Sequence, residues 1–149
     1  MTNDLSGGPY VAMAVFCEKA LQEKDGVFSI IRVIDRLTVN ASGLDAPRHM
    51  PPGQMNFPLV ISLKSGFAKG KFNLKVVPNS PSLKRLGESS IDLLLEGDDR
   101  GVNVVLNVQL IAQEEGLYWF DVILEEQLLT RIPFRFVYQR LAQGSLPET

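Results

Sequence analysis

The chain has 149 residues, the usual length of one domain and enough to bury a core without a disulfide or a metal. Its 15 basic and 17 acidic residues are spread along the chain and give a net charge of −2, so the basic surface that nucleic-acid binding requires is not expected. The single cysteine, Cys17, excludes an internal disulfide.

Residues 1–8 are predicted to be a disordered leader, because they combine polar residues with two glycines. The opening MTNDLSGGPY has neither the basic start nor the apolar run of a secretory signal. No stretch approaches the roughly 20 apolar residues of a membrane helix. Since a lone cysteine also fits a reducing compartment, we expect a cytoplasmic protein with no membrane partner.

The first third of the chain is predicted to hold two apolar strands. Tyr10 to Phe16 and Val27 to Ile34 are apolar on both faces, which is typical of central strands that are covered on both sides. Between them, residues 18–24 (EKALQEK) are rich in helix formers, so a short helix is an alternative there. The long loop that follows, residues 40–56, contains three prolines and the only histidine, His49. Loops of this length are often functional or disordered.

Period-two alternation predicts strands through the middle of the chain. The side chains expected to face the core are Leu59, Ile61, Leu63, Phe72, Leu74, Val76, Ile91, Leu93, Leu95, Val104, Leu106, Val108 and Leu110. Residues 65–70 are predicted to connect two strands, residues 78–82 to end one, and residues 97–101 to form a hairpin loop. This spacing predicts one all-β domain, residues 9–140, with about eight antiparallel strands in a two-sheet sandwich. Residues 141–149 are predicted to be a flexible tail.

The most regular pattern is a predicted hairpin over residues 116–138. Its inward side chains are Tyr118, Phe120, Val122 and Leu124 before a turn at residues 125–127, and Ile132, Phe134, Phe136 and Tyr138 after it. Pro133 predicts that the second strand lies at a sheet edge or carries a bulge. Trp119, Arg131 and Arg135 fall on the opposite, outer face.

The segment Gly-x-Tyr-x-Phe-x-Val at residues 116–122 resembles the penultimate strand of immunoglobulin-like sandwiches, in which the tyrosine hydroxyl bonds to the backbone near a corner. Together with the block CEKALQEKDGVFSIIRVIDRL at residues 17–37, it makes the chain similar to a group of small uncharacterised bacterial proteins with a domain of unknown function. The resemblance implies an immunoglobulin-like fold. It implies no activity, so no catalytic residue is carried over.

Few residues suit catalysis or metal binding. Cys17 and His49 are the only pair of the Cys/His type, and Cys17 ends an apolar run where a buried structural thiol is common. Zinc needs more such ligands than this chain offers. Glu96, Asp98 and Asp99 could bind calcium, but an isolated acidic turn is more often solvated. We therefore predict that the protein is not an enzyme and holds no cofactor and no metal.

These observations predict a non-catalytic interaction module that binds a protein partner, or a second copy of itself, through a sheet face or edge. The residues predicted to form the binding surface are Trp119, Arg131, Arg135 and His49, because tryptophan and arginine dominate the anchors of protein interfaces. The alternative is a sandwich that binds a small ligand or a carbohydrate with its end loops, residues 40–56 among them.

Overall fold

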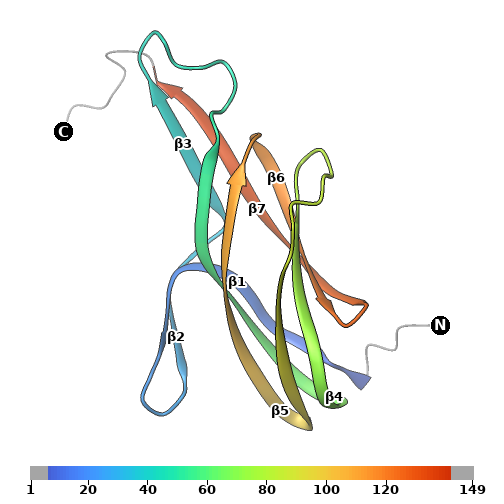
Figure 1. Cartoon of the computed structure of the whole chain (residues 1–149). Coiled ribbons are helices and arrows are strands. Elements are labelled where there is room, and N and C mark those ends of the chain that lie inside the picture. Colours follow the sequence, from blue (N-terminus) through green and yellow to red (C-terminus); the bar gives the residue numbers. More distant parts are fainter. Residues whose placement is uncertain (1–6, 142–149) are drawn as a thin grey trace.

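A computed structural model describes residues 7–141, which contain seven β-strands and no α-helix (Figure 1). The strands are β1 (Tyr10–Gln22), β2 (Phe28–Ile34), β3 (Arg36–Ser42), β4 (Gly53–Asn79), β5 (Ser89–Ala112), β6 (Gly116–Leu124) and β7 (Gln127–Leu141). Within these residues, no helix has the length and apolar character to cross a membrane. Of the predicted leader and tail, residues 1–6 and 142–149 lie outside the described range.

The all-β prediction is confirmed, with seven strands instead of about eight. Hydrogen bonds link the strands into one continuous sheet, in the order β2-β1-β4-β6-β7-β3 with β5 paired to β4. The pairs are antiparallel except β3–β7, which is parallel. Only Asp35 separates β2 from β3, so β3 continues along the chain direction of β2. The chain thereby passes from the edge of β1 to the edge of β7, and there it runs in the same direction as β7.

The continuity of the sheet comes from β4 and β5, which have 27 and 24 residues. The predicted connection at residues 65–70 and the predicted hairpin loop at residues 97–101 are both wrong, because these segments pair with each other and bend together. Gly66 lies opposite Asp98 and the register shifts on both sides of Gly66. Gly66 (φ 60°) and Asp98 (φ 55°) both take left-handed backbone conformations, which lets the paired ribbon turn without separating (Figure 1).

The core forms where the bent sheet folds over on itself. The ring of Phe16 on β1 lies edge-on to Phe120 of β6 and Phe134 of β7, with centroids 4.9 and 5.2 Å apart. Phe57 on β4 lies 6.2 Å from Phe134. Most predicted inward residues are buried, whereas Phe72, Leu106 and Tyr138 are half-buried and Ile91 is exposed. Each fully buried phenylalanine contributes about 1.5–3 kcal/mol of transfer free energy. Because these rings come from β1 on one side of the bend and from β6 and β7 on the other, their contact holds the bent sheet together.

The predicted tyrosine corner is present at the start of β6. The Tyr118 hydroxyl donates a hydrogen bond to the backbone oxygen of Glu114 at 2.6 Å, and the Tyr118 side chain is fully buried. Burial raises the pKa of the Tyr118 hydroxyl. The Glu114 carboxylate accepts a hydrogen bond from Ser82 N at 3.0 Å, and its hydrogen bonds to Ser82 lower its pKa. The corner therefore ties the connection before β6 to the one after β4.

The structure also tests the predicted helix, the predicted long loop and the predicted edge position of Pro133. The predicted helix over residues 18–24 is replaced by strand up to Gln22, where cross-strand pairing with β2 outweighs local helix propensity. The connection between β3 and β4 spans residues 43–52 and is shorter than the predicted loop of 40–56. The prediction that the strand with Pro133 lies at a sheet edge is wrong for β7 as a whole, because β7 lies between β6 and β3. Proline is tolerated at this position because the β3–β7 pairing begins only at Arg135, so Pro133 pairs with β6 alone.

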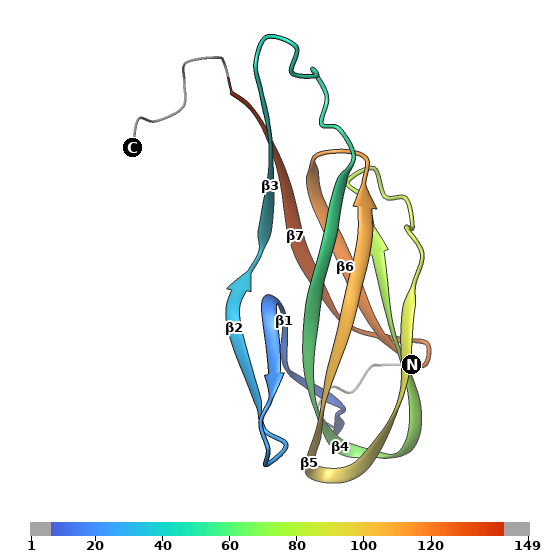
Figure 2. The same cartoon turned by 60° about the vertical axis from the view of Figure 1, so that its left-hand side comes forward.

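The prediction that the two N-terminal strands are central is wrong for β2, which ends the sheet. Its side chains Ile31 and Val33 are 41% and 63% exposed. In both views of the molecule, β2 lies at the margin with no strand on its outer side (Figures 1 and 2). An apolar composition on both faces therefore does not mean burial on both faces in this chain.

Candidate functional site

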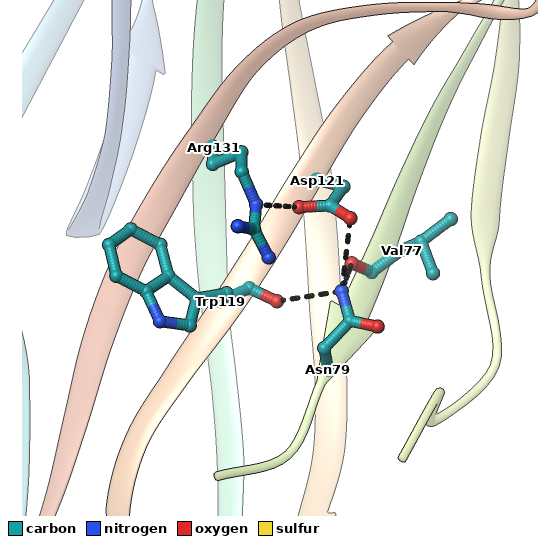
Figure 3. A network of polar contacts seen from close by, with 5 residues as sticks. All are labelled: Val77, Asn79, Trp119, Asp121 and Arg131. Carbon is teal, nitrogen blue, oxygen red and sulfur yellow. Dashed lines mark hydrogen bonds and ion pairs between the residues drawn. The ribbon is translucent and has the colours of Figure 1, made fainter. Parts of the chain in front are cut away.

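The predicted surface lies on the outer face of β6 and β7. Tyr118 and Phe120 point into the core, so the alternation of the strand turns Trp119 and Asp121 outward. Across the hairpin, Asp121 pairs with Arg131 and Trp119 pairs with Pro133. The structure therefore confirms that Trp119 and Arg131 share one face, and it adds Asp121 between them (Figure 3).

Arg131 bridges Trp119 and Asp121. Its Nε donates to Asp121 Oδ1 at 2.7 Å, and its Cζ lies 5.1 Å from the centroid of the Trp119 ring. Figure 3 shows the guanidinium group between the indole and the carboxylate. Trp119 is half-buried, whereas Arg131 is exposed. The arrangement is a cation–π contact whose cation is fixed in place by an ion pair.

Asn79, the last residue of β4, fixes the other side of the carboxylate. Its Nδ2 lies 3.2 Å from Asp121 Oδ2, 3.3 Å from the Trp119 backbone oxygen and 3.2 Å from the Val77 backbone oxygen (Figure 3). An exposed ion pair adds only about 0–1 kcal/mol to stability. The main effect of this network is therefore to hold the Arg131 guanidinium and the Trp119 ring in one geometry.

Arg135 extends this surface, and His49 does not. Arg135 is exposed on the same face, opposite Leu117 of β6 and beside Arg36 of β3. We refer to Asn79, Trp119, Asp121, Arg131 and Arg135 as the Trp119 patch.

His49 is exposed in the connection between β3 and β4, which leaves β3 beside Leu141. This connection folds back over the inner side of the sheet, because the Tyr138 hydroxyl donates to Pro47 O at 2.6 Å and Met50 is buried in the core. The other predicted residues lie on the outer face of β6 and β7. The structure therefore separates His49 from the other predicted residues. The reason is that a loop's place depends on strand pairing, which the sequence around His49 does not reveal.

Two members of the patch were absent from the sequence-based prediction. Asp121 carries a usable signal, because it alternates with Trp119 and lies opposite a basic residue of the same hairpin. Asn79 carries no local signal, because it reaches the patch through the pairing of β4 with β6.

The residues considered for catalysis and metal binding are arranged as follows. Cys17 is buried beside Pro58 O at 3.9 Å, and burial raises the pKa of its thiol. His49 is exposed in the loop. Glu96 forms an ion pair with Arg100 at 2.7 Å. Across residues 7–141, no three His, Cys, Asp or Glu side chains form a group that could hold a metal ion.

Two surface hollows lie beside connections between strands. One of about 340 Å³ lies beside the connection between β3 and β4, and its lining residues are Gly43, Leu44, Ala46, Arg140 and Leu141. Another, of about 220 Å³, lies beside the tyrosine corner and includes Ser80, Ile111 and Tyr118. Ligand sites usually combine an apolar cavity with several convergent polar groups. The hollow beside the β3–β4 connection offers one charged side chain, Arg140, whereas the hollow beside the tyrosine corner also includes Lys84 and Glu114.

The family of unknown function DUF6941 matches residues 12–137. The chain belongs to this family. The DUF6941 match includes every residue of the Trp119 patch. Comparison with curated proteins gives no match. Among solved structures, the chain is similar to the CARDB domain of a Pyrococcus furiosus protein, which was determined in complex with di-metal ions. The two are 12% identical with a TM-score of 0.41, over 92% of this chain and 99% of that domain.

Proposed function

We propose that this chain is a non-catalytic protein-interaction module of the bacterial cytoplasm, and that it binds a protein partner through the Trp119 patch. We further propose that its architecture is an immunoglobulin-like two-sheet sandwich. The bend in β4 and β5 supports this description, because it divides the continuous sheet into two packed halves. The tyrosine corner supports it as well.

The observation that carries the proposal is the Arg131 guanidinium held between Trp119 and Asp121. Binding normally costs about 0.5–1.5 kcal/mol for each flexible side chain that becomes ordered. Here the ion pair and the cation–π contact order Arg131 before any partner arrives. Tryptophan and arginine are also the residues most enriched among interface hot spots. The patch thus presents a fixed apolar ring beside a fixed cation.

The charge around the patch favours a partner with acidic groups. Arg131 is neutralised by Asp121, and Arg36 lies 3.5 Å from the carboxylate of Asp35. Arg135 lies between these two pairs and adds a positive charge to the exposed face. An acidic residue at the rim of the partner's interface would meet this charge, which mainly raises the association rate.

The proposal of a non-catalytic role is supported by the state of Cys17. A raised thiol pKa keeps the sulfur protonated near neutral pH, and the thiolate is the nucleophilic form. A fully buried side chain also has no access to a substrate.

The experiment is quantitative capture from a lysate of the source organism with three immobilised proteins. These are the wild type, Trp119→Glu and a matched control, Leu94→Glu, which charges an exposed apolar side chain on β5. We expect one protein to be captured by the wild type and the control, and lost with Trp119→Glu. Thermal unfolding must first show that both variants are folded. Equal capture by Trp119→Glu, or no specific capture by the wild type, would overturn the proposal.

A further inference from the structure

The hollow of about 220 Å³ beside the tyrosine corner lies where two connections meet. Residues 80–88 connect β4 to β5, and residues 113–115 connect β5 to β6. Figures 1 and 2 show the first connection beside the start of β6. The hollow is smaller than the roughly 300–1,000 Å³ of sites for drug-sized molecules, so it suits a smaller ligand.

The connection at residues 80–88 is held in one shape by its own hydrogen bonds. Ser80 N donates to Lys84 O at 2.8 Å, and Lys84 N donates to Ser80 Oγ at 3.0 Å. Leu83 N donates to Ser80 O at 2.9 Å. The Ser80 side chain is buried, and its Oγ lies 3.0 Å from Ser82 Oγ. A wall that is already ordered loses little conformational entropy when a ligand binds.

A charged carboxylate lines the hollow from the other connection. Glu114 Oε1 accepts a hydrogen bond from Ser82 N at 3.0 Å. Hydrogen bonds from Ser82 and Ser80, together with the positive charge of Lys84, lower the pKa of Glu114 from its ordinary value of 4.5. Glu114 is therefore ionised at neutral pH and offers a negative charge to a ligand.

A positive charge lines the same hollow without pairing with that carboxylate. The Lys84 ammonium is near enough to lower the pKa of Glu114, yet it forms no ion pair with Glu114 or with any other acid among residues 7–141. By contrast, the neighbouring Arg85 is paired with Glu88 at 3.2 Å. The hollow thus presents one negative and one positive group that are held apart.

Apolar side chains complete the lining. Ile111 of β5 is 58% exposed, and Leu86 is half-buried. The hydrogen bond between Glu114 and Ser82 ties the two connections together, but this structural role accounts for neither the exposed Ile111 nor the ammonium of Lys84. The apolar part of a ligand would remove Ile111 from water, which is favourable.

We propose that this hollow binds a free α-amino acid with an apolar side chain. Glu114 binds its ammonium group, Lys84 binds its carboxylate, and its side chain covers Ile111 and Leu86. A zwitterion satisfies both charges of the hollow, whereas a ligand with one charge, or a neutral sugar, leaves a charged group unpaired on burial, which costs free energy. The lining residues do not include any member of the Trp119 patch, so this site is independent of the proposed partner surface.

The test is a titration of the isotope-labelled full chain with L-leucine, followed by its backbone amide resonances in NMR spectra. The Ser82 amide reports directly, because it donates to Glu114. We expect a saturable shift of this resonance with a Kd of about 1 mM or tighter. N-acetyl-L-leucine lacks the positive charge and L-leucinamide lacks the negative one, so each should bind about 10-fold more weakly. D-glucose, the neutral probe, should give no saturable shift.

Two variants assign each charge of the ligand to its partner. Glu114→Gln keeps an oxygen that accepts from Ser82 N and should weaken L-leucine binding about 10-fold, while the affinity for N-acetyl-L-leucine stays that of the wild type. Lys84→Met keeps a long side chain and should weaken L-leucine binding by a similar factor, while the affinity for L-leucinamide is unchanged. The matched control is Glu88→Gln, which neutralises an exposed acid of the same connection outside the hollow and should bind like the wild type.

Trp119→Glu should also bind L-leucine like the wild type, so a failure of partner capture and a failure of this site are separate results. The absence of a saturable shift with L-leucine at about 10 mM would overturn the proposal. Equal affinities for L-leucine and its two singly charged analogues would overturn it as well, because the hollow would then recognise only the apolar side chain. Binding of D-glucose in place of L-leucine would assign the hollow to a carbohydrate and refute the amino-acid site.

Discussion

Replacing Tyr118 by phenylalanine tests the tyrosine corner directly. The change removes one hydroxyl and leaves the shape of a fully buried side chain intact, so no cavity forms. What is lost is the hydrogen bond to Glu114 O at 2.6 Å and the weaker contact from Glu114 N at 3.4 Å. Losing a buried hydrogen bond and leaving its acceptor unsatisfied costs about 1–2 kcal/mol. For a chain of this length that corresponds to a decrease in Tm of about 3–6 °C.

The assay is equilibrium unfolding in urea, followed by the fluorescence of the single tryptophan, Trp119. Tyr138→Phe is the matched control, because the Tyr138 hydroxyl also donates to a backbone oxygen, that of Pro47, at 2.6 Å. This second bond is exposed, so water can replace it and the expected loss is below about 0.5 kcal/mol. Equal losses in the two variants would refute the reasoning that burial makes the corner stabilising.

The pH dependence gives a second readout of the same residue. Burial raises the pKa of folded Tyr118 above its ordinary value of 10.0, so the neutral hydroxyl is favoured in the folded state. Its contribution to the free energy of unfolding is therefore complete below pH 10 and is lost as the pH rises through the folded-state pKa. Tyr118→Phe should show a smaller alkaline loss of stability than the wild type. The same loss in both proteins would contradict the assignment.

Three further predictions concern other contacts. Arg131→Gln should lower the free energy of unfolding by less than about 1 kcal/mol and shift Trp119 emission to the red, and an unchanged emission would contradict the cation–π contact. Cys17 should react with a thiol reagent at least about 100-fold more slowly in the native protein than in urea, whereas fast native labelling would show that the thiol is accessible. Gly66→Ala should cost more than about 2 kcal/mol, because its φ is left-handed and a Cβ would overlap Gly7 O. Gly26→Ala, with similar φ but open space around it, should cost about 1 kcal/mol in the same unfolding assay, and equal losses would contradict the overlap.

Alternation predicted the strands and their inward faces well, because a period of two follows from strand geometry alone. In the C-terminal hairpin, alternation also predicts how the two strands pair. Tyr118 and Phe120 face inward, as do Ile132 and Phe134. Both sets therefore stay in the core only in a register that places even-numbered residues of β6 opposite even-numbered residues of β7. The predicted three-residue turn gives that register. The structure reaches it with a two-residue turn, Glu125–Glu126, followed by a register shift after Val122.

The sequence predicts two loops where the structure has one bend, because the same residues suit both. Glycine with a left-handed φ is typical of a turn, and it is equally suited to a bend in a paired ribbon. What distinguishes the two is that Gly66 lies opposite Asp98, a pairing between distant segments that local chemistry does not encode. The same limit explains Asn79, which joins the patch through the pairing of β4 with β6.

The β2 strand shows a different limit. Its apolar residues predicted burial on both faces, and the structure leaves Ile31 and Val33 exposed at an edge. Composition indicates that these side chains favour an apolar environment. It does not indicate whether that environment is supplied by the same chain or by a second one.

The uninterrupted β4–β5 ribbon has a consequence for how the chain folds. Its innermost pair, Val76 with Ser89, is 13 positions apart in sequence, and its outermost pair, Gly53 with Ala112, is 59 positions apart. Once the connection at residues 80–88 has closed, each new pair adds only two residues to the loop already formed. The distant pairs therefore form with little further loss of chain entropy. We expect folding to start at this connection and to propagate through the bend, so that both halves of the core are acquired in one cooperative step.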